Sequence, residues 1–162
     1  MKKEIRIVKV KVEGIEVCQC GECSARVFLV EEDGQRWLRP YIGPFEARAI
    51  LMKLSGQTPP RPLTHDLAAD IIRQAGLNIT KAVITELRDN TYYANLVDEA
   101  GGVEKRIDCR PSDAIAMALR LGIPIYANEE LLEELEGKTA RMEADIAGRP
   151  FVFDINIDPK SI

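Results

Sequence analysis

The sequence predicts an α+β domain in which capped helices pack on a mixed, largely antiparallel sheet made of β-hairpins. Three observations lead to this fold class. Apolar and polar side chains alternate in several short segments, pairs such as Asp33-Gly34 and Asp89-Asn90 form turns between them, and two segments with helix-capping residues follow the hairpins. The length of 162 residues suits one domain with a sizeable core, which we place at residues 1–137, with a C-terminal extension at 138–162.

The first half of the chain predicts strands that lead into a helix. Val8, Val10 and Val12 alternate with charged residues, which is typical of a half-exposed strand. A helix with an apolar face follows, and Gly56 ends it. The expected elements are strands at 4–13, 25–31 and 35–42, a helix at 44–54 and a stiff, proline-rich connection at 57–63.

The second half repeats hairpins and adds a charged segment near its end. Asp89-Asn90 joins two well-alternating segments, and Gly101-Gly102 leads into a further strand. Asn128 is placed to cap a helix rich in glutamate. The expected elements are strands at 78–88, 91–98, 103–108 and 123–127, a helix at 129–136 and a late strand at 151–155.

Two arginine-proline pairs each precede a stretch that reads as a helix led by an aspartate. Proline does least harm at a helix start, and Thr64 and Ser112 are expected N-caps. Glycines at 76 and 122 are placed to end these helices, and the segment from Asp113 to Leu121 is apolar enough to be buried on all sides. Because hairpin strands precede both motifs, the halves suggest an internal duplication. The motifs are Arg61-Pro62-Leu63-Thr64-His65-Asp66-Leu67 and Asp108-Cys109-Arg110-Pro111-Ser112-Asp113-Ala114-Ile115.

The bulk composition is that of an ordinary globular protein, with 46% hydrophobic and 30% charged residues. The net charge of −4 gives no general field that attracts nucleic acid, so any nucleic-acid site depends on local basic residues. The N-terminus has no apolar run behind its lysines, and no segment has the length of a membrane span. We therefore expect a cytoplasmic protein.

His65 is the single histidine of the chain and lies in the first turn of its expected helix. The positive end of the helix dipole disfavours a protonated imidazole there, so a neutral ring is expected that acts as a base or a ligand. Asp66 follows directly and Asp70 lies one turn further on. The alternative is that His65 is a surface or packing residue beside a helix cap.

Asp108, Arg110 and Asp113 lie where a strand ends and a helix begins, a place where proteins often bind anions. Arg110 is either a phosphate ligand or the partner of one of these carboxylates in a structural ion pair. Glu46, at another helix start, is a further carboxylate that could take part in chemistry. The alternative is that its negative charge only stabilises the positive end of the helix dipole.

Cys18, Cys20 and Cys23 are close enough together to suggest a metal site. Tetrahedral zinc needs four ligands, and Cys109 is the remaining thiol of the chain. Zinc bound by these four cysteines and a loop without metal are the two alternatives.

Taken together, these motifs resemble the bifunctional nuclease domain family, formerly a bacterial domain of unknown function, over most of the chain. The cysteine cluster, Cys109 and the tail after Gly137 depart from the family pattern. The motifs that carry the resemblance are Glu31-Glu32-Asp33-Gly34, Ile42-Gly43 with Glu46-Ala47, Arg61 to Leu67, Asp89 to Ala94, Ile107-Asp108 and Arg110 to Ala116.

The resemblance implies an α+β fold that self-associates and an ability to cut both RNA and DNA. In that function His65, Asp66, Asp113 and Glu46 are the catalytic candidates, and Arg61 and Arg110 hold phosphate oxygens. Mg²⁺ or Mn²⁺ is expected on carboxylates, among them Asp66, Asp108 and Asp113. The alternative is a non-catalytic oligomeric module that binds an anionic small molecule or a protein partner. Short hairpins also leave edges and apolar faces to cover, so at least a dimer is expected.

Overall fold

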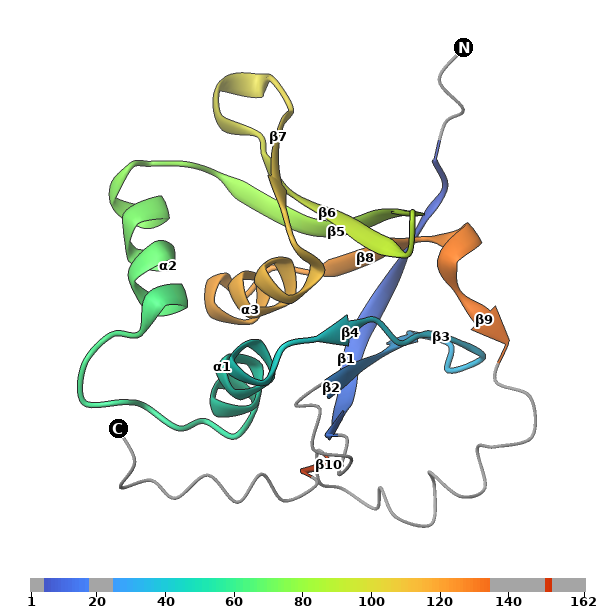
Figure 1. Cartoon of the computed structure of the whole chain (residues 1–162). Coiled ribbons are helices and arrows are strands. Elements are labelled where there is room, and N and C mark those ends of the chain that lie inside the picture. The colour runs from blue at the N-terminus through green and yellow to red at the C-terminus, as the bar shows by residue number, and fades with distance from the viewer. Residues whose placement is uncertain (1–4, 18–24, 135–150, 153–162) are drawn as a thin grey trace.

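The computed structural model describes residues 5–17, 25–134 and 151–152 and has the expected α+β fold (Figure 1). Its strands form one sheet in the order β7-β6-β5-β8-β1-β2-β3-β9, while β10 pairs with β1 and β4 pairs with β2. Most neighbours are antiparallel, but β5 and β8 are parallel, and so are β1 and β10. The sheet is therefore mixed and largely antiparallel, as predicted.

The strands lie close to the segments predicted from alternation. Residues 35–42 are an exception, because Arg39 and Pro40 interrupt them, and proline cannot donate to a strand ladder. The bounds are β1 Ile7–Val17, β2 Ala25–Glu31, β3 Arg36–Leu38, β4 Tyr41–Ile42, β5 Ile79–Arg88, β6 Thr91–Asp98, β7 Lys105–Cys109, β8 Ile125–Asn128, β9 Glu133–Glu134 and β10 Phe151–Val152.

The turn at Asp89-Asn90 joins β5 to β6 as predicted. Both residues have positive φ, 49° for Asp89 and 58° for Asn90, which is the left-handed conformation of the tight turns that match the twist of a hairpin. Asparagine and aspartate tolerate this conformation better than other residues with side chains. The Asp89-Asn90 turn thus sets the pairing of β5 with β6 next to the turn, where Arg88 lies opposite Thr91.

The described residues form three α-helices, α1 Pro44–Leu54, α2 Thr64–Gln74 and α3 Pro111–Leu121. The predicted N-caps Thr64 and Ser112 are wrong, because α2 and α3 begin earlier, with Leu63 and Arg110 as their N-caps. In α2, the Asp66 carboxylate accepts a hydrogen bond from the backbone N–H of Leu63 at 2.9 Å and does the capping instead. The predicted stop at Gly122 is confirmed by its φ of 69°.

The predicted helix at 129–136 is also wrong. Asn128 does cap its segment by accepting a hydrogen bond from the N–H of Glu130, but only the 3₁₀ turn Glu129–Leu131 follows. The chain then pairs with β3 as β9, so sheet pairing takes over where the glutamates predicted a helix. Ala100–Gly102 forms another 3₁₀ turn. The last residues of the predicted helix and of the late strand at 151–155 lie outside the described residues.

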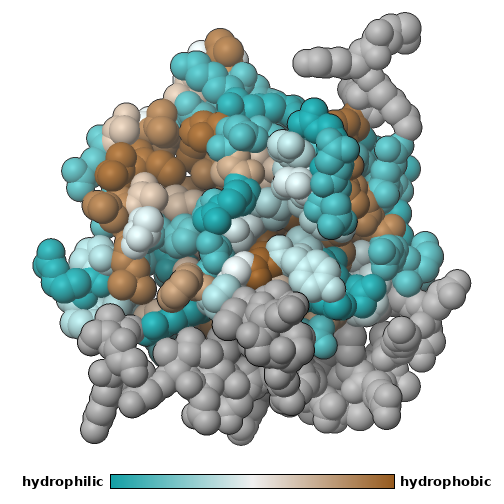
Figure 2. All heavy atoms as spheres, in the orientation of Figure 1, coloured by the Kyte–Doolittle hydropathy of each residue, from teal (hydrophilic) through white to brown (hydrophobic). Residues whose placement is uncertain are grey.

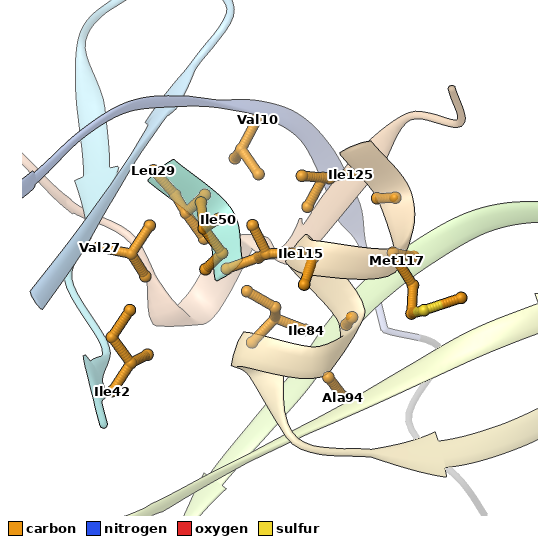
Figure 3. Close-up of a cluster of buried hydrophobic side chains, with 14 of the residues drawn as sticks. Val10, Val27, Leu29, Ile42, Ile50, Ile84, Ala94, Ile115, Met117 and Ile125 are labelled. Carbon is orange, nitrogen blue, oxygen red and sulfur yellow. The ribbon is translucent and has the colours of Figure 1, made fainter. Parts of the chain in front are cut away.

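The core lies between the sheet and helices α1 and α3, as Figure 3 shows. α1 packs on β1 and β2, α3 packs on β5 and β6, and the two helices contact each other, so they cover one face of the sheet (Figure 1). α2 lies outside α3 and contacts it. Ile50, Ile84 and Ile115 are fully buried and bring α1, β5 and α3 together.

α3 is the most buried helix, as its composition predicted. Eight of its residues are buried, including the polar Ser112 and Arg120, whereas α2 buries only Ala69. Figure 2 shows hydrophobic side chains on the surface over α2. None of the helices in the described part of the chain is long and apolar enough to cross a membrane.

Replacement of Ile115 by alanine is expected to lower the free energy of unfolding by about 2–5 kcal/mol, because it leaves a cavity between α3, α1 and the sheet. Leu87→Ala is the matched control. Leu87 is 45% exposed on β5, so its truncation should cost less than about 1 kcal/mol. Chemical denaturation monitored by circular dichroism measures both values. Equal losses for the two variants would show that α3 is not the centre of the core.

Candidate functional site

An open groove with a volume of about 950 Å³ lies where the starts of all three helices meet. Each start carries an acidic residue at the third helical position: Glu46 in α1, Asp66 in α2 and Asp113 in α3. The groove collects side chains from segments that are far apart in the chain. Its lining residues are Pro44, Phe45, Glu46, Arg48, Ala49, Met52, Pro62, Leu63, Thr64, His65, Arg110 and Asp113.

His65 and Asp113 form a pair at the base of this groove. His65 Nε2 lies 3.1 Å from Asp113 Oδ1, and the side chains are 17% and 27% exposed. Burial raises the pKa of Asp113, but hydrogen bonds from Arg110 and His65 outweigh it, so this pKa lies below its ordinary value. An ionised carboxylate only accepts hydrogen bonds, so Nε2 of His65 is the donor and carries a proton.

The proton on Nε2 leaves Nδ1 as the other nitrogen of the ring. Among the described residues, no hydrogen bond to Nδ1 is formed. In a neutral imidazole this nitrogen has a lone pair that accepts a proton. A histidine whose ring is oriented by a carboxylate is the arrangement by which many hydrolases hold a general base.

Arg110 holds two of the acidic residues together. Its Nε and one terminal nitrogen donate to the two oxygens of Asp113 at 2.7 and 3.0 Å, and the other terminal nitrogen donates to Glu46 Oε1 at 2.9 Å. These bonds raise the pKa of Arg110, led by the hydrogen bond to Asp113. Arg110 therefore forms ion pairs with the carboxylates, and its role toward phosphate stays a prediction. Its side chain is nevertheless 64% exposed, and two of its five N–H groups remain for a ligand.

Gly43 makes room for the carboxylate of Glu46. A Cβ at position 43 would lie 2.1 Å from Glu46 Oε2, so a side chain there would displace this carboxylate from its place beside Arg110. The backbone of Gly43 is extended, with φ of −72°, and does not itself require glycine. The glycine is thus needed for the close approach of Glu46, and this explains the Gly43-Pro44-Phe45-Glu46 order at the start of α1.

Asp66, the neighbour of His65, is engaged elsewhere. Its Oδ1 accepts a hydrogen bond from Arg120 Nε at 2.6 Å, while Oδ2 caps α2. Burial raises the pKa of Asp66, but the hydrogen bonds from the Leu63 amide and Arg120 outweigh it and lower the pKa below its ordinary value. Asp66 and Arg120 line a second hollow, of about 220 Å³.

Arg120 is a residue that the sequence analysis overlooked. Its side chain is 6% exposed, and besides Asp66 it donates to the carbonyl oxygens of Ala49 and Ala116. The arginine therefore joins α3 to both other helices. Its position inside an otherwise apolar, buried helix was the signal in the sequence, because a buried arginine needs a partner.

Besides Asp66, two more predicted site residues do not line the groove. Arg61 is exposed and makes no ion pair or hydrogen bond with another described residue, and Asp108 is exposed on β7 opposite Asn95. The carboxylates proposed as metal ligands, Asp66, Asp108 and Asp113, are not brought together. Across the described residues, no group of three or more histidine, cysteine, aspartate or glutamate side chains is arranged to hold a metal ion.

Of the four cysteines predicted to bind zinc, only Cys109 lies among the described residues. Cys18, Cys20 and Cys23 lie outside the described residues, while Cys109 is half-buried at the end of β7. Burial, followed by the nearby Asp113 and Asp108, raises the pKa of the Cys109 thiol to about 11. Zinc on the four cysteines stays a prediction, and elemental analysis of the purified protein tests it.

The sequence of this chain is similar to a family of known proteins. The sequence model of the bifunctional nuclease domain matches residues 27–139. An uncharacterized protein of Mycobacterium tuberculosis is 37% identical over 131 residues, which are 81% of this chain and 74% of that protein. The rice protein "Bifunctional nuclease 1" (Oryza sativa subsp. japonica) is 31% identical over 110 residues, which are 65% of this chain and 33% of the rice protein.

The Asp66–Arg120 pair predicts a pH-dependent stability. Asp66→Ala leaves a buried arginine without its counter-charge and should lower the free energy of unfolding by about 3–5 kcal/mol at neutral pH. Because the folded-state pKa of Asp66 is lowered, its contribution is present above its unfolded pKa of about 3.9 and is lost as the pH falls through the folded pKa. The deficit of the variant should therefore shrink below about pH 4.

Asp70→Ala is the control for this measurement. Asp70 lies on the same helix and forms a surface pair with Arg73 in which both side chains are about half exposed, so its removal should change stability by no more than about 1 kcal/mol. Urea denaturation between pH 3 and 7 gives the comparison. A deficit for Asp66→Ala that is small, or that stays constant across this range, would contradict the assigned role.

Proposed function

Because the chain belongs to the bifunctional nuclease domain family, we propose that it hydrolyses phosphodiester bonds in DNA, RNA or both, in the groove at the helix starts. The observation that carries this proposal is the His65–Asp113 pair at 3.1 Å inside an open groove that also contains arginines. A structural histidine needs neither an orienting carboxylate nor access to a groove. The combination is what a general base for hydrolysis needs.

In this function His65 Nδ1 takes a proton from the attacking water, and Asp113 keeps the ring oriented and stabilises the imidazolium that forms. The two unused N–H groups of Arg110 donate to the phosphate oxygens, and Glu46 holds the guanidinium in place from the other side. Glu46 and Asp66 are thus assigned positioning and structural roles, in contrast to the catalytic roles expected from the sequence.

A divalent ion is expected from the resemblance, but the carboxylates of the groove already accept hydrogen bonds from Arg110 and His65 at the oxygens that would bind it. Both oxygens of Asp113 accept hydrogen bonds from Arg110, Oδ1 also accepts one from His65, and Glu46 is bound to Arg110. The proposed chemistry therefore uses the side chains of the groove alone. Cleavage assays with Mg²⁺, Mn²⁺ or EDTA decide whether activity needs one.

The main competing function is a non-catalytic module that binds an anionic ligand or a protein partner. The observation in its favour is that Arg110 is already paired with the carboxylates of Glu46 and Asp113, so its positive charge is balanced before a phosphate binds. Such a module would bind its ligand without changing it. Product analysis after incubation with RNA and with DNA separates the two functions.

His65→Ala and Asp113→Asn should each reduce the cleavage rate by roughly 10²–10⁴-fold, the usual contribution of a general acid–base group. Asp70→Asn is the matched control, since this exposed carboxylate on α2 lies outside the groove. Cleavage of labelled RNA and single-stranded DNA is measured by gel electrophoresis, with thermal unfolding of every variant as the check on folding. Folded variants with unchanged cleavage, or wild-type protein that cuts nothing under all three ion conditions, would contradict the proposal.

We further propose that copies of the chain associate through α2. Leu63, Leu67 and Ile71 recur along one side of this helix and are 41%, 55% and 58% exposed. Apolar side chains that cluster on a surface in this way favour a partner surface.

Association through α2 predicts that Leu67→Ser combined with Ile71→Ser yields monomers, because serine removes the apolar area that drives contact. Val103→Ser is the control, as Val103 is 61% exposed in a loop away from α2. Light scattering at tens of micromolar reports the mass of each protein. A monomeric wild-type protein, or variants that remain oligomeric, would argue against an α2 interface.

A further inference from the structure

Phe45 is the most exposed large hydrophobic side chain of the described residues, at 81%. It is the second residue of α1 and stands beside Glu46, whose carboxylate is held by Arg110. Burial of a phenylalanine stabilises a fold by about 1.5–3 kcal/mol, and Phe45 contributes almost none of this. The ring therefore lies free at the groove while its neighbours are fixed.

The groove has a charged end and an apolar side. Phe45, Ala49 and Met52 follow one another at helical spacing along α1 and all line it, and Pro62 and Leu63 add apolar surface from the segment that leads into α2. His65, Asp113 and Arg110 form the charged end. A ligand that fits this groove must itself carry charge and flat apolar surface side by side.

Arg48 adds a cation to this groove. It lines the groove one turn after Phe45 and makes no ion pair or hydrogen bond with another described residue. Arg110, by contrast, is balanced by two carboxylates. The charge of Arg48 is thus the one in the groove that no partner within the described chain offsets.

A nucleotide chain has the required combination of features. Its phosphates are anionic, and each base has a π face that stacks on an aromatic ring for about 1–3 kcal/mol. We propose that Phe45 stacks on the base of the nucleotide whose phosphate lies at Arg110, and that Arg48 binds the adjacent phosphate. This subsite rests on the proposed function, because it takes nucleic acid as the ligand of the groove.

The test compares binding of a short oligo(dT) with binding of an abasic deoxyribose-phosphate chain of equal length, measured by fluorescence anisotropy on ice in EDTA. Phe45→Ala should weaken binding of oligo(dT) by roughly 5- to 150-fold, which corresponds to the loss of one stacked base. It should leave the abasic chain unaffected, and Phe45→Trp should restore binding. Tyr41→Ala is the control, since Tyr41 is an exposed aromatic outside the groove that stacks with Arg26.

Arg48→Ala should behave differently from Phe45→Ala. A phosphate contact does not depend on the base, so both ligands should lose affinity. The slope of log K against log salt concentration should become shallower by about 0.7, the value for one phosphate contact on a single strand. Since Arg48 makes no ion pair or hydrogen bond with another described residue, its variant should unfold at the wild-type temperature.

Equal effects of Phe45→Ala on the two ligands would overturn the subsite, and so would no effect on either. Conversion of an oligomer to a monomer by Phe45→Ala would assign the ring to a protein interface instead, and would overturn it too. Base-dependent binding through Phe45 without cleavage would reject the nuclease function and keep the subsite. Cleavage by the wild-type protein that Phe45→Ala leaves unchanged would keep the nuclease function and reject the subsite. Absence of binding to both ligands would reject the subsite.

Discussion

The burial of α3 is the constraint on which the rest of the structure depends. A helix that is enclosed by α1, α2 and the sheet must satisfy the polar groups at both of its ends inside the protein. Arginines tie both ends of α3 to the other helices. Arg110 precedes the helix and donates to Glu46 of α1, and Arg120 in its last turn donates to Asp66 of α2 and to a carbonyl of α1. At the C-terminal end, Arg73 of α2 donates to the carbonyl of Arg120. The same residues that dock α3 therefore set the positions of the other two helices, and with them the shape of the groove.

The internal duplication suggested by the sequence stays a prediction, and the positions of the helix starts bear on it. The repeated arginine-proline pairs suggested that α2 and α3 correspond, but their registers differ, since Pro111 is the first residue of α3 whereas Pro62 precedes the N-cap of α2. All three helices have eleven residues and an acid at the third position, but only α1 and α3 begin with proline, so these two are more alike. The acids of α1 and α3 both bind Arg110, so the likeness brings two equivalent carboxylates onto one guanidinium.

Much of the fold could be predicted from the sequence, because alternation, turn pairs and apolar helices are local signals. β2, β6 and α1 have the predicted bounds, and α3 is the buried helix. Local signals failed where a partner distant in the chain decides the outcome. Pairing with β3 overrides the helical tendency of the glutamates after Asn128. The helix starts are a different case, because the nearby Asp66 and Pro111 act there in place of the expected hydroxyl caps.

The site was predictable in its residues but not in its pairings. His65, Arg110, Asp113 and Glu46 do meet, across 48 positions for His65–Asp113 and 64 for Arg110–Glu46, and no sequence spacing encodes such contacts. The pairing of Asp66 with Arg120 was not predicted for the same reason, because these two residues are 54 positions apart. Adjacent residues on a helix point about 100° apart, so His65 and Asp66 face different hollows although they are neighbours in the chain.

The charge of the protein bears on how a groove of this kind would hold nucleic acid. A net charge of −4 repels a polyanion at long range, and in the groove two arginines face two carboxylates. Affinity must then come from short-range contacts, which are less sensitive to the overall field: the remaining N–H groups of Arg110, the unpaired Arg48 and a base on Phe45. Stacking does not depend on charge and is little screened by salt, so a protein that lacks a basic surface needs an aromatic contact more than a basic protein does. Under the proposed function, stacking on the exposed Phe45 would supply affinity that the charge of an acidic chain does not.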